Sequence, residues 1–194
     1  MRGFLWFAVL VAVALPIILA ANSPLLAWRE PIYILAGFAG VLGLGALLFQ
    51  PLLVGGYLPS LDGLKGRRFH RWIGLFLITT IVVHVACLWV TSPPDVVDAL
   101  TFTSPAPFSA WGVVAMWAAF AAALLAVLRR RLKWHPQAWR HRHAVLATVT
   151  SVCTVIHVLL IEGTMEPVSK AILCALVLGA TVLLWLGLFR RARR

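Results

Sequence analysis

The sequence predicts an all-α integral membrane protein, in which residues 1–194 form one domain, a bundle of six transmembrane helices. Hydrophobic residues make up 62% of the chain and its mean hydropathy is +0.95, whereas soluble proteins are usually about half apolar. The apolar residues lie in uncharged blocks of about twenty, the length of helix that crosses roughly 30 Å of hydrocarbon. The alternating pattern of barrel strands is absent, so the predicted spans are helices.

The six blocks predict helices over residues 4–20, 31–54, 72–90, 110–128, 144–161 and 168–189. The first block also fits a signal peptide, because Arg2 precedes it and small residues follow. Its length and the interruption at Pro16 favour a retained helix. Residues 91–109, with four prolines, form the longest predicted loop, which we expect to fold over the outer end. The second helix has a small-residue face for close packing, formed by Gly37, Gly40, Gly43 and Gly45.

The basic residues predict the orientation of the bundle. Of 17 lysines and arginines, only Arg29 and Lys170 fall on one side. The other side holds Arg2, Lys65, Arg67, Arg68, Arg71, Arg129, Arg130, Arg131, Lys133, Arg140, Arg142, Arg190, Arg191, Arg193 and Arg194. The positive-inside rule then places both termini in the cytoplasm of a bacterial-type inner membrane. It also explains the net charge of +11 without nucleic acid, so the predicted partner is membrane lipid. Tryptophans near both boundaries, Trp139 among them, are interpreted as an aromatic belt.

Two histidines, His84 and His157, are the only ionisable side chains well inside the apolar blocks, where polar groups are costly and usually functional. Each has a second histidine fourteen residues before it, His70 and His143 respectively. Fourteen residues turn a helix to within about 40° of its starting direction and raise it by roughly 21 Å. Each pair therefore points to one side of its helix, with its members at opposite ends of the span.

The predicted third and fifth helices both run from inside to outside, so they are parallel and their histidines share levels. His70 and His143 meet at an inner level. His84 and His157 meet at an outer level. Two facing imidazoles suit bis-histidine haem iron, a ligand set that favours electron transfer, whereas zinc and copper normally take more protein ligands. The spacing therefore predicts two b-type haems stacked between the third and fifth helices, and no catalytic residue is assigned.

The remaining polar and sulfur-containing residues receive less specific interpretations. His135 and His141 are interpreted as solvated residues of the basic loop before the fifth helix. The arginines beside the inner histidines could pair with haem propionates, and the positive-inside rule explains them equally well; they are Arg68, Arg71, Arg140 and Arg142. The three cysteines are interpreted as small buried hydrophobic residues; they are Cys87, Cys153 and Cys174.

The stretches RRFHRWIGLFLITTIVVHV and WRHRHAVLATVTSVCTVIHV resemble the third and fifth helices of the ferric reductase-like transmembrane domain. That superfamily includes NADPH oxidases, ferric reductases and the haem-binding subunit of the periplasmic methionine sulfoxide reductase system. The resemblance implies that His70, His84, His143 and His157 bind haem, and that electrons move from a cytoplasmic reductant to an acceptor outside. Family oxidases continue into a flavin and nicotinamide domain, whereas these 194 residues contain no Gly-rich dinucleotide fingerprint.

The sequence thus predicts a transmembrane electron-transfer subunit, an oxidoreductase component that works with a separate reductase. We expect a cytoplasmic flavin reductase or quinol as donor, with flavin or quinone supplied through that partner. The expected acceptor is a periplasmic protein, a ferric chelate or oxygen. One alternative is a quinol-oxidising di-haem cytochrome b. Another is a transporter or channel with structural histidines, which the lack of carboxylates inside the predicted helices disfavours.

Overall fold

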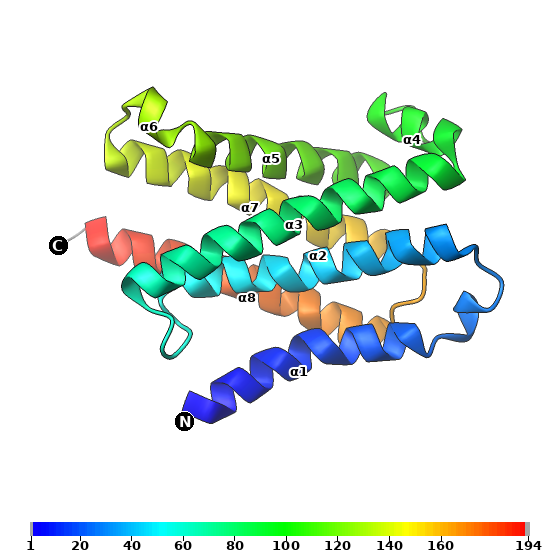
Figure 1. Ribbon diagram of the computed structural model, residues 1–194, viewed down its shortest axis with the longest axis horizontal. Helices are drawn as coiled ribbons and strands as arrows, with labels where there is room; N and C mark the ends of the chain where they lie inside the picture. Colours follow the sequence, from blue (N-terminus) through cyan, green and yellow to red (C-terminus); the bar gives the residue numbers. More distant parts are fainter. Residues whose placement is uncertain (1, 193–194) are drawn as a thin grey trace.

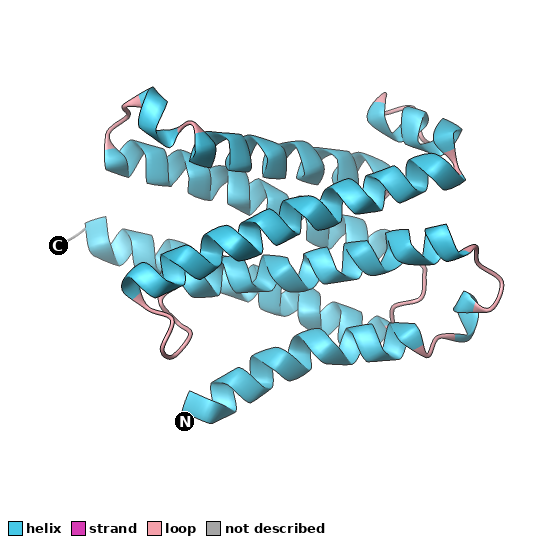
Figure 2. Cartoon of the chain, in the orientation of Figure 1, coloured by secondary structure: helices cyan, strands magenta, loops and turns pink. Residues whose placement is uncertain are grey.

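The structure, a computed structural model, describes residues 2–192 and contains no strand within them (Figures 1 and 2). Its six long helices are α1 (Arg2–Ala21), α2 (Pro31–Gly55), α3 (Gly63–Thr91), α5 (Ser109–Val127), α7 (Pro136–Leu160) and α8 (Pro167–Ala192). The shorter elements are the 3-10 turn η1 (Pro24–Leu26) and the helices α4 (Pro93–Leu100) and α6 (Arg129–Leu132). Arg193 and Arg194 lie outside the described residues, as do the side chains of Arg2 and Arg191.

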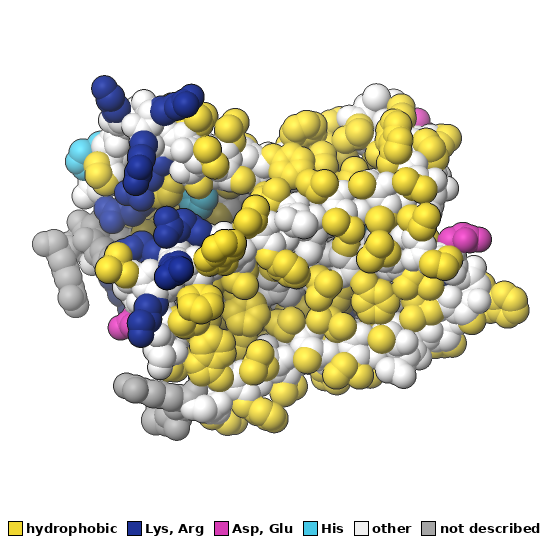
Figure 3. Space-filling view, viewed as in Figure 1, with side chains coloured by type: hydrophobic (Ala, Val, Ile, Leu, Met, Phe, Trp, Pro, Cys, Tyr) yellow, Lys and Arg dark blue, Asp and Glu magenta, His cyan; other side chains and the backbone are white. Residues whose placement is uncertain are grey.

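All six long helices are long and apolar enough to cross a membrane. Their outward faces are covered with hydrophobic side chains, and lysines and arginines gather at one end of the bundle (Figure 3). Large side chains such as Phe7, Leu124 and Ile172 are more than half exposed. Such a surface is unfavourable in water and suits lipid tails, in which only helices and closed barrels satisfy their backbone. The chain is therefore a multi-pass, all-α membrane protein, as predicted.

The bundle contains two closely packed helix pairs, α2 with α3 and α5 with α7, and the helix α8 joins them. The helix α3 packs along α2, and α7 packs along α5, whereas α3 and α7 have few backbone contacts with each other. The helix α8 lies against both α2 and α7, and α1 packs against α8 and α2. A cavity lies between the later halves of α3 and α7, lined by residues such as Leu77 and Thr150.

The main core lies where α2, α7 and α8 meet. Leu44, Leu173 and Val177 are at most 1% exposed, and Val155 of α7 joins the same cluster. Lipid is as apolar as these side chains, so dispersion contacts and close fit stabilise the packing in place of the hydrophobic effect.

The glycines of α2 allow neighbouring helices to approach closely. A Cβ added to Gly43 would lie 3.1 Å from Thr80 Oγ1 of α3, and one added to Gly45 would lie 2.8 Å from Val13 of α1. The predicted small-residue face therefore makes close contacts at these two positions. At Gly37 the prediction is wrong, because an added Cβ there would meet nothing within 4 Å.

The helices that carry the histidine pairs begin about two turns earlier than predicted. The apolar blocks begin at Trp72 and Ala144, whereas α3 begins at Gly63 and α7 at Pro136. The first turns of both helices contain basic residues that lower the hydropathy but favour helix, and Pro136 suits a first helical position. As a result His70 and His143 lie inside the helices, on the same continuous elements as their fourteen-residue partners.

Residues 91–109 are not a simple loop, because they contain the helix α4. Ser92 precedes this helix and its hydroxyl donates a hydrogen bond to the Asp95 carboxylate, which lies in the first turn. The helix packs against α3 and α5, and its Val96 is buried. The segment therefore covers the end of the bundle opposite the basic end (Figure 1), as expected.

Candidate functional site

Four histidines of α3 and α7 lie in pairs at two levels of the bundle. Both helices run from the basic end to the opposite end (Figure 1), so they are parallel, as predicted. The fourteen residues between His70 and His84, and between His143 and His157, give each pair a rise of roughly 21 Å. The inner level is defined here as the one nearer the basic end, and the outer level as the one nearer α4.

At the inner level, His70 and His143 bring their imidazoles together. Their ring centroids are 6.2 Å apart and the ring planes are inclined at 77°. The Nδ1 atom of each ring is buried and has no hydrogen-bond partner among the described residues. Buried polar atoms nearly always have a partner, and leaving one without costs about 1–3 kcal/mol. The backbone carbonyls of Gln50 and Ala122 lie near His70 and His143, fourteen residues along α2 and α5 from the carbonyls that the outer rings bind, but neither contact has the geometry of an ordinary hydrogen bond.

At the outer level, each imidazole is tied to a backbone carbonyl of a different helix or loop. His84 Nδ1 lies 2.7 Å from the carbonyl oxygen of Ala36, and His157 Nδ1 lies 2.8 Å from that of Phe108. A carbonyl only accepts, so both Nδ1 atoms donate and both Nε2 atoms keep a free lone pair. This arrangement is the usual support of a metal-binding histidine, because it fixes both the tautomer and the ring orientation.

Two glycines make room for the outer rings. A Cβ added to Gly112 would lie 2.7 Å from two atoms of the His157 ring, and one added to Gly40 would lie 3.4 Å from His84 Nδ1. The sequence pattern indicated only a packing role for Gly40 and gave no reason to select Gly112. The pairing between a glycine and a histidine on different helices depends on tertiary structure, so sequence spacing carries no signal for it.

The outer histidines line a cavity of about 570 Å³ bounded by α2, α3, α4, α5 and α7. Its apolar walls include Leu44 and Leu77, and Thr80 and Thr150 contribute hydroxyls that donate to carbonyls of their own helices. Mostly apolar walls with a few directed polar groups are typical of cofactor and ligand sites. The two basic residues outside the basic end, Arg29 and Lys170, also line this cavity.

The arginines selected as propionate partners are all exposed at the basic end; they are Arg68, Arg71, Arg140 and Arg142. The guanidinium of Arg142 lies 4.0 Å from the centre of the Trp134 ring, so its present contact is a cation–π pair. The role of these arginines toward haem stays a prediction.

The other two histidines lie apart from the inner and outer pairs. His135 is exposed at the N-cap position of α7. His141 was expected in the preceding loop, but it lies within α7 because Pro136 begins that helix earlier. Its ring packs edge-on against Trp185 of α8, with centroids 5.0 Å apart. The sixteen residues between His141 and His157 turn it away from the shared histidine face.

The sequence interpretation missed a role for Trp139, whose indole stacks on His143. The ring centroids are 5.1 Å apart and the planes differ by 10°. The two residues are four apart on one helix, so a single turn separates them. This spacing was visible in the sequence, but the position of Trp139 near a membrane boundary was explained by the aromatic belt alone.

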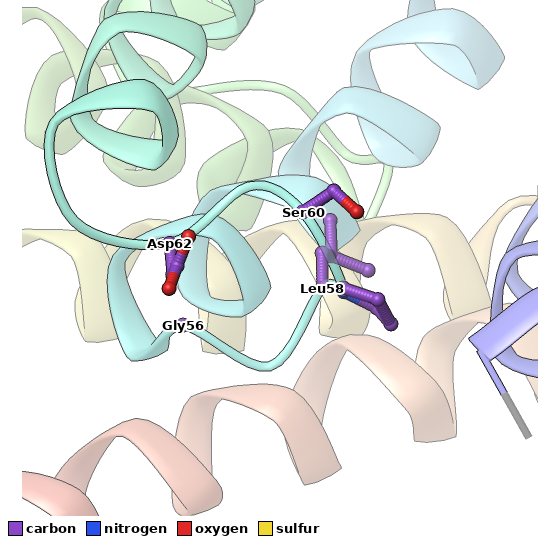
Figure 4. A pocket seen from close by; sticks show the side chains of 5 residues that line it. Gly56, Leu58, Ser60 and Asp62 are labelled. Atoms are coloured by element: carbon purple, nitrogen blue, oxygen red, sulfur yellow. The ribbon is translucent and has the colours of Figure 1, made fainter.

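Among the described residues, neither the cysteines nor a second cavity provides a further set of metal ligands. Cys153 and Cys174 are buried, as predicted, whereas Cys87 is half-buried. Within residues 2–192, no group of three or more His, Cys, Asp or Glu could hold a metal ion. A hollow of about 320 Å³ lies in the α2–α3 loop, lined by Gly56, Leu58, Pro59, Ser60 and Asp62 (Figure 4). It contains no histidine, so the two histidine levels remain the candidate site.

Comparison with known proteins supplies the family. No curated protein and no solved structure matches the chain. The family model described as "Ferric reductase like transmembrane component" matches residues 39–154, a segment that begins in α2, ends in α7 and includes His70, His84 and His143. A domain of this family suggests transmembrane electron transfer, and domains of this family generally bind haem. Since the match spans more than half of the chain, the protein belongs to the ferric reductase-like transmembrane family, in agreement with the resemblance of its third and fifth apolar blocks.

Proposed function

We propose that this protein carries electrons across a membrane through two b-type haems. His70 and His143 would hold the inner haem. His84 and His157 would hold the outer one. The observation that carries the proposal is the pairing of imidazoles from two parallel helices at two levels, in the same fourteen-residue register.

The inner pair fits an iron bound between two imidazoles. An imidazole nitrogen binds a metal ion at about 2 Å, so two rings on opposite sides of one ion have centroids about 6 Å apart. The distance of 6.2 Å between the His70 and His143 centroids agrees with this requirement.

The outer pair fits by its hydrogen bonds and its cavity. With Nδ1 donating to Ala36 and Phe108, the Nε2 lone pairs of His84 and His157 are the atoms available to a metal. Both side chains line the same largely apolar cavity of about 570 Å³, which would exclude water from a bound macrocycle. Bound haem would supply the iron that changes oxidation state by one electron at each level, and its potential would follow the ligands and the surrounding dielectric.

The charge distribution supports a direction for electron flow. Basic residues gather at the inner end (Figure 3), which under the positive-inside rule faces the cytoplasm of a bacterial-type inner membrane. The donor in this proposal is a flavin reductase or quinol that reaches the inner pair. The acceptor is a periplasmic protein, a ferric chelate or oxygen that reaches the outer pair.

Haem content and optical spectra test this function directly. Purified full-length protein produced with ample haem should bind about two haems per chain and give low-spin b-type bands when oxidised and when reduced with dithionite. Each bis-histidine site is saturated by its two imidazoles, so neither haem should give a high-spin spectrum. A colourless, folded preparation would overturn the proposal.

A further inference from the structure

The inner histidines lie near the backbone carbonyls of Gln50 and Ala122 without forming hydrogen bonds of ordinary geometry to them, and one of the two rings has a further support. The indole of Trp139 lies nearly parallel to the His143 ring, with an interplanar angle of 10° and 5.1 Å between centroids. His143 Nδ1 is buried without a hydrogen-bond partner among the described residues. The contact with the Ala122 carbonyl is therefore a weak restraint on rotation of the His143 ring about its Cβ–Cγ bond, and the stacked indole adds a second one.

Trp139 is itself fixed by contacts with α5 and α6. Its Nε1–H donates a hydrogen bond to the carbonyl oxygen of Leu125 at 3.1 Å. The guanidinium of Arg129, in α6, lies 4.6 Å from the centre of the indole. A tryptophan held at both its N–H and its π-face has few rotamers left, so it can hold a neighbouring ring in one orientation.

We propose that Trp139 is the positioning residue of the inner haem site, where its stacked indole holds a ring whose contact with a backbone carbonyl is weaker than the contacts of the outer rings with Ala36 and Phe108. This inference rests on the proposed function, because it assigns a support to a haem ligand. Trp139 acts through His143 and does not bind the iron. Arg129 adds a positive charge beside the stack, which favours the reduced state of the inner iron because reduction removes one positive charge from it.

The simpler explanation of Trp139 is that it belongs to the aromatic belt at the membrane boundary. Trp134 provides a matched control for that explanation. Trp134 lies near the same boundary and also pairs with an arginine, Arg142, at 4.0 Å. Among the described residues its ring has no aromatic contact with His70 or His143. A belt role predicts similar effects at Trp134 and Trp139, whereas a positioning role predicts an effect at Trp139 alone.

The experiment compares Trp139→Leu, Trp139→Phe and Trp134→Leu in the full-length protein loaded with haem. Loss of a group that orients a metal ligand typically lowers metal affinity by about 10- to 100-fold. We therefore expect Trp139→Leu to weaken one of the two haems by at least about tenfold and to shift only that haem's midpoint potential and low-spin EPR signal. Trp139→Phe keeps an aromatic face and should recover most of both signals. Trp134→Leu should behave as the unaltered protein.

Three results would overturn the inference. One is a Trp139→Leu protein with the haem affinities, potentials and EPR spectrum of Trp134→Leu. Another is a loss of both haems in Trp139→Phe, which would indicate a fold requirement. The third is unaltered protein that binds no haem, which would remove the proposed function as well and so differs from the first two.

The positive charge of Arg129 is tested separately. Arg129→Gln should lower the midpoint potential of the same haem, by an amount that decreases as salt screens the exposed guanidinium.

Discussion

The two histidine levels of this bundle are built in different ways. At the outer level, His84 and His157 donate to backbone carbonyls and line a cavity covered by α4. At the inner level, His70 and His143 lie near the carbonyls of Gln50 and Ala122, but their buried Nδ1 atoms form no hydrogen bond of ordinary geometry among the described residues. Rings hydrogen-bonded to backbone carbonyls are firmly oriented, whereas the inner rings have weaker contacts with backbone and depend more on neighbouring side chains such as Trp139. We therefore expect the outer pair to be the more rigid of the two, and the inner pair to be more sensitive to its neighbouring side chains.

The largest effects should come from the histidines themselves. Replacing His84 or His157 with Ala deletes one of two axial ligands, so the protein should keep about one haem per chain and lose the outer one. The corresponding changes at His70 and His143 should remove the inner one. Haem content and potentiometric titration, in which one of two midpoint potentials disappears, measure the result.

His141→Ala is the control for these variants, because this exposed histidine packs against Trp185 and lies off the shared face. It should retain both haems. Loss of haem from His141→Ala together with full haem in His143→Ala would mean that α7 presents a different histidine to the inner level.

A smaller but selective effect is expected at Gly112. An added Cβ would lie 2.7 Å from the His157 ring, so Gly112→Ala forces the imidazole away from the Phe108 carbonyl at a cost of about 1–3 kcal/mol. The outer haem should bind roughly ten- to a hundredfold more weakly while the inner haem is unchanged, as measured by haem titration.

Gly37→Ala is the matched control, because Gly37 also lines the cavity but an added Cβ there meets nothing within 4 Å. If the Gly112 and Gly37 variants lose the outer haem equally, or neither loses it, the close approach of Gly112 to His157 is unimportant for the site.

The salt dependence of the rate of haem reduction should show whether electrons enter at the inner end. The side chains exposed there would attract an acidic protein surface; they include Lys65, Arg67, Arg68, Arg129, Arg130, Arg131 and Lys133. Reduction by a soluble flavin reductase with NAD(P)H should therefore slow by about tenfold or more as salt rises from about 0.01 M to 1 M, because the Debye length falls from roughly 30 Å to 3 Å. Stopped-flow spectroscopy of the haem bands measures the rate.

The same experiment separates the two classes of donor. Quinol is small and dissolves in lipid, so its reaction should depend little on salt. Rapid reduction by a quinol analogue, with no response to flavin reductases, would favour the quinol-oxidising alternative. The basic side chains would then serve only orientation and contact with anionic lipid.

The sequence predicted the fold well because hydropathy and charge act along the chain. Six spans, the shared side of each histidine pair and the parallel direction of α3 and α7 all follow from local periodicity and basic residues. The starts of α3 and α7 were predicted too late, since hydropathy does not register a helix that continues into a basic segment. The supports of the histidines were not predictable in this way. The carbonyls of Ala36 and Phe108 and the space at Gly112 are brought to the histidines only by packing between helices.

The smallest expected effect concerns pH and involves the outer end alone. The carboxylate of Glu166 accepts hydrogen bonds from the backbone N–H groups of Val168 and Ser169, at 2.8 and 2.6 Å, at the start of α8. These bonds hold the pKa of Glu166 below its ordinary value, the bond from Ser169 contributing most. A lowered folded-state pKa means that this contribution to stability is fully present above the ordinary pKa of a glutamate, about 4.3. It is lost as the pH falls through the lower folded-state value.

Glu166→Ala should therefore reduce thermal stability slightly at neutral pH and leave it unchanged in strong acid, with no change in either haem spectrum. Glu162→Ala removes another carboxylate from the segment before α8, and it serves as the control because it leaves the first turn of that helix intact. Thermal unfolding in lipid nanodiscs across the acid range measures the difference. A Glu166→Ala protein that loses as much stability in strong acid as at neutral pH would show that the effect is not electrostatic. A shift in the inner haem's potential would contradict the separation of the two levels, because Glu166 lies at the end of the bundle opposite that haem.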